Sequence, residues 1–159
     1  MSSMSCESKA AWRRSALRAG VVACAVLVGA CDEKLRDVVG PSPNLQPTFS
    51  SIQKEIFETT DLAGRASCVG CHTNQGRNPS GGLNLFGTPY DALVGVPSRG
   101  RPDLRFVVPG DPDASYLVQK LEGAPGISGT RMPRSGPPYL SAGQMLVIRR
   151  WIELGARRD

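Results

Sequence analysis

The residues best suited to chemistry lie in one five-residue string, Cys68-Val69-Gly70-Cys71-His72. Two cysteines three positions apart lie on one side of a helical turn, and the adjacent histidine projects its imidazole towards the same side. With this spacing, two thiols can form thioether bonds to a haem while the imidazole binds its iron. The string therefore predicts one covalent haem c, attached at Cys68 and Cys71, with His72 as the proximal iron ligand.

Three other uses of a Cys-x-x-Cys pair fit less well. A zinc site needs a second pair of ligands, and after residue 30 the chain has no other histidine and only Cys31 as a further cysteine. A thioredoxin-like redox pair requires a βαβ context, which the glycine- and proline-rich sequence after His72 does not offer. A structural disulfide across two residues is uncommon.

The single histidine also restricts the second axial ligand of the iron. Methionine is the next choice, and the chain after residue 30 contains Met132 and Met145. Met145 has the helical spacing of a core residue, whereas Met132 lies in a loop beside Pro133. We therefore predict Met132 as the distal ligand, the alternative being a surface or gap-filling methionine. Such ligation closes the iron and favours electron transfer.

The first 30 residues predict export. Basic residues up to Arg18 precede an apolar run over residues 19–30, which is too short to span a bilayer and ends in small residues. Leu27-Val28-Gly29-Ala30-Cys31 resembles a lipobox, so we expect a lipoprotein signal peptide over residues 1–30 and a lipid anchor at Cys31 on the periplasmic face of a bacterial membrane. A secretory signal cleaved near Ala30, an uncleaved membrane helix and a weaker lipobox at Cys24 are the alternatives.

This interpretation accounts for all 5 cysteines of the chain. Cys6 and Cys24 leave with the signal, Cys31 carries lipid, and the last two bind haem. No free thiol then remains, which suits an oxidising compartment. Residues 31–48 mix charged and turn-forming residues without periodicity, which predicts a flexible tether.

The net charge of +5 does not indicate nucleic-acid binding. Four of the 19 basic residues and one of the 14 acidic residues precede Cys31, so the remainder carries about +2. Two haem propionates would roughly cancel this charge. We therefore expect no nucleic-acid partner.

Local signals predict four short helices around the haem string. The first begins at a capping box formed by Ser50 and Gln53, and Ile52, Ile56 and Phe57 form its apolar stripe. This stripe extends over about two turns.

The second and third helices have start signals of the same kind. Pro89 opens a helix over residues 89–94, which Gly95 stops. Asp111 caps a third helix that runs to Leu121.

The fourth helix begins at a capping box of Ser141 and Gln144 and runs to Leu154, before Gly155. Trp151 falls on its apolar side. Core packing is therefore the expected role of Trp151.

Residues 48–156 resemble class I cytochrome c. Several fragments are closest to planctomycete-type and other environmental bacterial cytochrome c domains: Ile56-Phe57, Gly81-Gly82-Leu83-Asn84-Leu85, Val108-Pro109-Gly110-Asp111, Arg131-Met132-Pro133 and Trp151-Ile152-Glu153-Leu154-Gly155-Ala156. The resemblance implies an all-α domain over residues 49–157, with about four short helices and long loops around one haem ligated by His72 and Met132.

The resemblance also implies that the first and last helices pack together. It places side chains from Ile52, Ile56 or Phe57 against those of Ile148, Trp151 or Ile152. Four residues are expected to line the haem pocket, and two arginines to face its propionates or solvent: Leu83, Leu85, Phe106 and Tyr116, and Arg131 and Arg134.

The expected function is a membrane-anchored carrier of single electrons between a redox donor and an acceptor, with no catalytic residues. A haem enzyme or gas sensor would require Met132 to dissociate, and the chain offers no distal histidine for acid-base chemistry. A haem subunit of a larger oxidoreductase complex is the other alternative, which the sequence does not separate from a mobile carrier.

Overall fold

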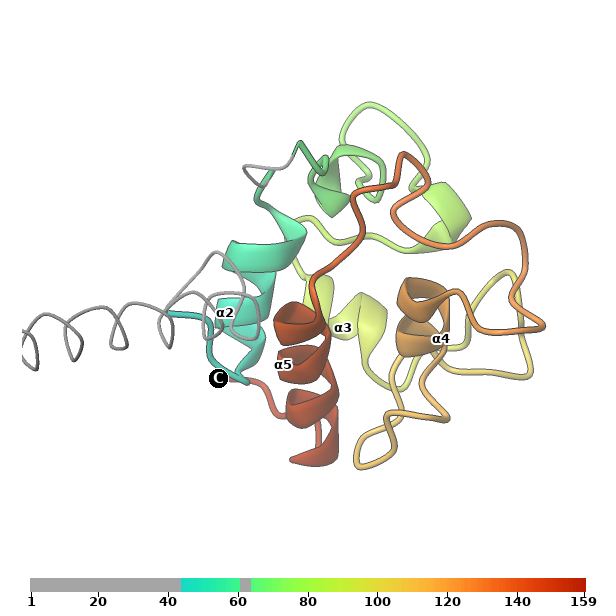
Figure 1. The fold of residues 1–159 in the computed structure, drawn as a ribbon. Helices are drawn as coiled ribbons and strands as arrows, with labels where there is room; N and C mark the ends of the chain where they lie inside the picture. Colours follow the sequence, from blue (N-terminus) through green and yellow to red (C-terminus); the bar gives the residue numbers. More distant parts are fainter. Residues whose placement is uncertain (1–43, 61–63) are drawn as a thin grey trace, which may run out of the picture. The chain divides into compact units, whose positions relative to one another are not determined.

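Four short helices dominate the computed structural model, which describes residues 44–60 and 64–159 (Figure 1). The order is α2 (Phe49–Ile52) with its π-helical continuation η1 (Gln53–Phe57), the 3₁₀ turns η2 (Cys68–Gly70) and η3 (Ser80–Gly82), then α3 (Pro89–Leu93), α4 (Tyr116–Glu122) and α5 (Ala142–Glu153). Only isolated backbone bridges, and no strands, occur among the described residues. The prediction of a small, mostly helical domain is confirmed at this level.

The predicted signal peptide, Cys31 and most of the predicted tether lie outside the described residues. Leu45, within the predicted tether, is buried in the core. In the part of the chain that is described, no helix is long and apolar enough to cross a bilayer.

The first helix begins at a different cap from the one predicted. Thr48, not Ser50, is the cap, and its side-chain oxygen accepts a hydrogen bond from the Ser51 amide at 3.4 Å. Gln53 does not reach back, because its side-chain amide donates to the Leu85 carbonyl at 2.9 Å. The earlier start places Phe49 in the core, one turn before Ile52. The predicted capping box is therefore wrong, although the helix exists.

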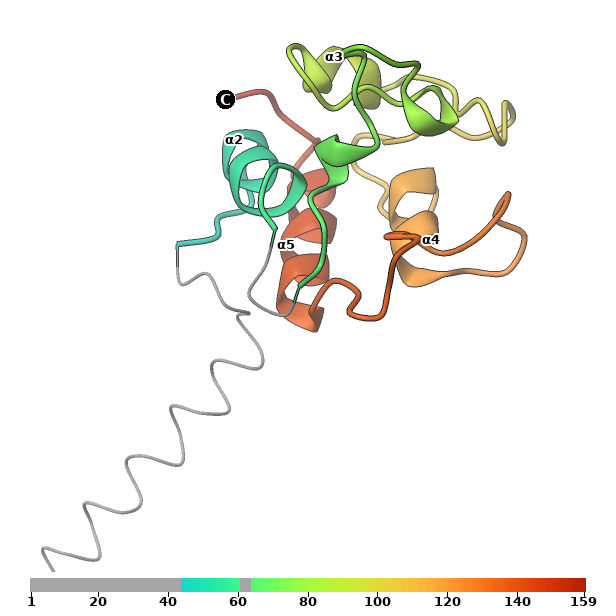
Figure 2. The ribbon, with the colours of Figure 1, turned by 90° about the horizontal axis from the view of Figure 1, so that it is seen from above.

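The packing of α2 against α5 agrees with the expectation for the first and last helices (Figures 1 and 2). The rings of Phe49 and Trp151 have their centroids 5.6 Å apart. Trp151 is almost fully buried, and its indole N–H donates to the Arg157 carbonyl at 2.9 Å. Trp151 thus has the predicted core role.

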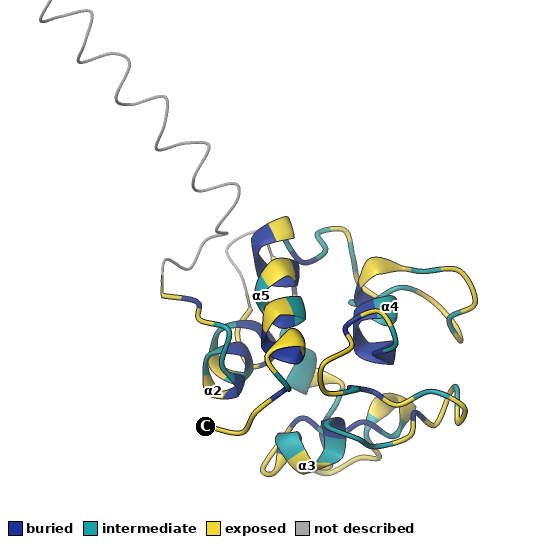
Figure 3. Ribbon diagram, turned by 90° about the horizontal axis from the view of Figure 1, so that it is seen from below, coloured by how far each residue is buried: buried dark blue, intermediate teal, exposed yellow. Residues whose placement is uncertain are grey.

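The helix α5 follows its sequence signals closely. Ser141 Oγ accepts from the Gln144 amide at 3.2 Å, and Gln144 Oε1 accepts from the Ser141 amide at 3.0 Å. This reciprocal capping box is the predicted one. Buried and exposed residues alternate along the helix in Figure 3, as expected when one face of a helix packs on a core.

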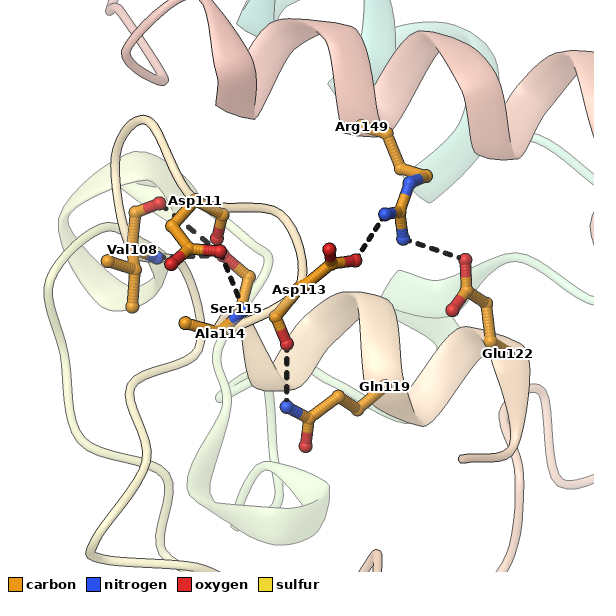
Figure 4. Close-up of polar contacts among 8 residues, drawn as sticks. All are labelled: Val108, Asp111, Asp113, Ala114, Ser115, Gln119, Glu122 and Arg149. Carbon is orange, nitrogen blue, oxygen red and sulfur yellow. Dashed lines mark hydrogen bonds and ion pairs between the residues drawn. The ribbon is translucent and has the colours of Figure 1, made fainter. Parts of the chain in front are cut away.

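The helix α3 also agrees with its prediction, but α4 begins later than predicted. Ser115, not Asp111, precedes its first residue. The buried Ser115 hydroxyl accepts from the Val108 amide at 2.9 Å and donates to the Asp111 carbonyl at 2.7 Å, while the Asp111 carboxylate accepts from the Ala114 amide (Figure 4). These contacts hold the chain in a turn, so the first residue of the helix is Tyr116.

An arginine of α5 connects the last helix to both ends of α4. The Arg149 guanidinium donates to Glu122 at 3.0 Å and to Asp113, which lies just before α4 (Figure 4). Because α4 carries several residues of the site described below, this contact helps to fix one wall of that site.

Candidate cofactor-binding site

The described residues enclose a cavity of about 870 Å³, its open mouth included. Apolar side chains form most of the wall: Phe57, Leu83, Leu85, Phe106, Leu117 and Leu121. Tyr116 adds a hydroxyl group. All four residues expected to line a pocket do line this one.

Three of the predicted site residues meet at this cavity, namely Cys68, His72 and Met132. Cys68 lies in the turn η2 and His72 two residues after it, whereas Met132 comes from the distant loop between α4 and α5. Met145 is buried in the hydrophobic core and does not line the cavity. Of these two methionines, Met132 alone lines the cavity, and its role as an iron ligand stays a prediction.

The two cysteines lie at opposite ends of one tight turn. The carbonyl of Cys68 accepts from the amides of Cys71 and His72 at 3.2 and 2.9 Å, which closes the turn. Both side chains are free thiols, that of Cys68 half-buried and that of Cys71 exposed. Burial raises the pKa of the Cys68 thiol above its usual 9.0, so this group is protonated at neutral pH.

The imidazole of His72 is held in a single tautomer. Its Nδ1 lies 2.9 Å from the Ser80 carbonyl oxygen, which can only accept, so Nδ1 carries the proton. Burial lowers the pKa of His72 below 6.5, which keeps the ring neutral at pH 7. The lone pair of Nε2 is therefore available to a metal ion.

The backbone around His72 is fixed by neighbouring turns. The His72 carbonyl accepts from the Leu85 amide at 2.8 Å, and the Cys71 carbonyl accepts from the Ser80 amide at 3.2 Å. Gly82, in the turn η3, has φ of 72°, and a Cβ there would meet Arg99 Nε at 2.7 Å. The turn that presents the Ser80 carbonyl to the imidazole thus depends on a glycine.

The loop that carries Met132 is bound to α4 by several hydrogen bonds. The Met132 amide donates to the Lys120 carbonyl at 2.9 Å, and the Ser128 amide donates to the Tyr116 hydroxyl at 2.8 Å. Arg131 Nε donates to the Leu121 carbonyl at 2.7 Å. These contacts hold the half-buried thioether of Met132 at the cavity wall.

Arg131 and Arg134, the two arginines near Met132, differ in their surroundings. The Arg131 guanidinium lies over the Tyr139 ring, 3.9 Å from its centroid, in a cation–π contact. Arg134 is exposed to solvent.

Sequence reasoning missed two contributors to this site, the Ser80 carbonyl and the side chain of Lys120. The pair Gly81-Gly82 signals a turn but not what the turn faces. From the sequence alone, Lys120 resembles any polar residue on the surface of a helix, but in the structure it lines the cavity.

A neutral imidazole and a thioether at one apolar cavity can together bind a transition metal of intermediate softness. Among residues 44–60 and 64–159, no three histidine, cysteine or carboxylate side chains are grouped so that they could hold a metal ion. Comparisons of the chain with protein-family models, curated proteins and solved structures give no match.

Proposed function

We propose that the chain is a monohaem c-type cytochrome that carries single electrons. The observation that carries this proposal is that the His72 imidazole, the Cys68 thiol and the Met132 thioether all line one apolar cavity. When bound there, haem supplies an iron that alternates between the ferric and ferrous states. The residues that line the cavity suit haem in two ways: an imidazole and a thioether can bind its iron, and the apolar side chains can contact its largely apolar ring.

Cys68 and Cys71 form the covalent bonds to the haem. Each thiol adds across one vinyl group: a carbon–sulfur bond forms, the thiol hydrogen passes to the other vinyl carbon, and no oxidant is needed. Both thiols are free and belong to one turn. The same turn brings His72 beside them.

His72 acts as the proximal ligand through Nε2. The hydrogen bond from Nδ1 to the Ser80 carbonyl fixes the ring orientation and increases the basicity of the ligating nitrogen. Met132 is the distal ligand, and a methionine raises the reduction potential relative to a second histidine.

The apolar wall of the site suits outer-sphere electron transfer more than chemistry on a substrate. Phe57, Phe106 and Leu117 contribute to this wall. Anchoring through Cys31 at the periplasmic face and transfer between a donor and an acceptor belong to the same proposal. They stay predictions.

Expression of the full chain in a host with c-type haem attachment machinery, followed by mass spectrometry of the mature protein, tests the proposal. We expect one haem per chain and acylation at Cys31. The double substitution Cys68→Ala and Cys71→Ala should abolish covalent haem attachment. A mature wild-type chain without haem would end the proposal.

Two further measurements separate the alternative functions. Rapid binding of carbon monoxide to the reduced protein would indicate a ligand-binding haem protein in place of a carrier. Purification from native membranes would recover a mobile carrier alone, whereas a subunit of an oxidoreductase would co-purify in a fixed ratio.

A further inference from the structure

Lys120 holds the methionine loop with both its backbone and its side chain. Its carbonyl accepts from the Met132 amide at 2.9 Å. Its ammonium group donates to the Ser128 carbonyl at 2.9 Å and to the Thr130 carbonyl. One residue of α4 therefore contacts three of the five residues from 128 to 132.

The position of Lys120 makes these contacts local to the site. Lys120 lines the cavity, one helical turn after Tyr116, whose hydroxyl accepts from the Ser128 amide. Two successive turns of α4 thus bind the same loop. Hydrogen bonds from a charged donor are stronger than neutral ones, so the ammonium contributes more than the Tyr116 hydroxyl.

An ammonium suits this position because it has three donor hydrogens and can serve two carbonyls at once. A hydrophobic side chain of similar size would leave the carbonyls of Ser128 and Thr130 without this donor. The loop would then be held mainly by its backbone contacts with α4, and Met132 would leave the cavity wall more readily.

We infer that Lys120 is a positioning residue that keeps Met132 in place and so limits the access of external ligands to the iron. The inference rests on the proposed function, because it assigns a role in the ligation of the haem. The proposed role depends on the hydrogen bonds of the Lys120 ammonium group, and the iron ligands stay His72 and Met132.

The affinity of the oxidised holoprotein for imidazole tests this role, because imidazole must displace Met132 to bind. We expect Lys120→Leu to increase this affinity by about tenfold or more, since two charge-assisted hydrogen bonds are lost. Lys120→Arg, which keeps a multiple donor, should restore most of the wild-type affinity. Lys54→Leu is the matched control: Lys54 is exposed and does not line the cavity.

Amide hydrogen exchange gives a second readout that does not depend on redox activity. The amides of Ser128 and Met132 should exchange faster in Lys120→Leu, while that of Leu85, which bonds to His72, should not change. Lys120→Gln is a milder variant for both measurements if Lys120→Leu accumulates poorly.

The outcomes separate the two proposals. Wild-type protein without haem would defeat the proposed function itself. Haem-loaded Lys120 variants with wild-type imidazole affinity and wild-type exchange at Ser128 and Met132 would overturn only the role of Lys120. Equal changes in Lys54→Leu would do the same, because they would reflect general loss of charge.

Discussion

The Ser80 carbonyl oxygen lies 2.9 Å from His72 Nδ1, although neither residue belongs to one of the α-helices. The contact depends on the turn η3, whose residue Gly82 adopts a left-handed conformation. Because the acceptor is a backbone atom, substitution of the Ser80 side chain would not remove it. A test of this contact must therefore change the backbone conformation of the turn η3.

Gly82→Ala should disturb His72. The exposed Arg99 side chain can move away from the new Cβ, but a φ of 72° costs an alanine about 1–2 kcal/mol, and this strain falls within the turn that presents the Ser80 carbonyl. We expect a shifted or broadened NMR signal of the His72 Nδ1 proton in the variant.

Gly87→Ala is its control, since Gly87 also has positive φ, of 77°, but nothing lies within 4 Å of a Cβ placed there. It should lose similar stability and leave the Nδ1 signal unchanged. Equal NMR changes in both variants would refute a specific role for the turn at Gly82.

Met132→Ala should remove the weak near-infrared band that a methionine sulfur gives with ferric iron. The reason is that Met132 is the methionine that lines the cavity with His72. Covalent haem should be retained, because the cysteines are unchanged. Absorption spectra of the oxidised protein measure the band.

Met145→Leu is the comparison variant for this experiment. Met145 is buried in the core, and a volume-conserving exchange there costs less than about 1.5 kcal/mol. The band should persist in this variant. Loss of the band in Met145→Leu together with its survival in Met132→Ala would reverse the ligand assignment.

Asp159 should stabilise the fold above acidic pH. Its carboxylate accepts from the amide of Ser50 at 3.1 Å and from the Ser50 hydroxyl, and these bonds lower the pKa of Asp159 below its usual 3.8. A carboxyl group with a lowered pKa in the folded state stabilises that state above its unfolded pKa. This contribution disappears as the pH falls through the folded pKa.

The difference in unfolding free energy between wild type and Ser50→Ala should therefore be larger at pH 6 than at pH 2. Denaturant titrations at both pH values provide the measurement. A double variant with Asp159→Asn should lose little more than either single variant at pH 6. Additive losses would show that the two side chains act independently.

Arg149→Met should lower the unfolding free energy by about 1 kcal/mol at low salt. The guanidinium binds both Glu122 and Asp113, and partly exposed ion pairs contribute about 0–1 kcal/mol each. The loss should shrink in 1 M salt because of screening. Arg150→Met, which removes the exposed pair with Glu153, should have a smaller effect.

Local signals in the sequence were sufficient for much of the fold. The capping box of Ser141 and Gln144 and the start of α3 at Pro89 depend on residues within one turn. A sequence pattern can therefore indicate where these helices begin. The convergence of Met132 with His72 was also predicted, because few other residues can ligate iron.

Other features depend on contacts between distant segments. The start of α2 at Phe49 accompanies the burial of Phe49 against Trp151, which no local pattern reveals. The roles of Ser80 and Lys120 follow from where loops meet the cavity. Loops lack the periodicity that makes helices predictable.

Cys68 and Cys71, the free thiols within residues 44–60 and 64–159, differ in exposure, and this difference allows the protein without haem to be labelled chemically. Cys71 is exposed, whereas Cys68 faces the cavity. An alkylating reagent should therefore mark Cys71 first, and haem attachment would block that reaction. The fraction of molecules without haem can thus be measured from the extent of modification at Cys71.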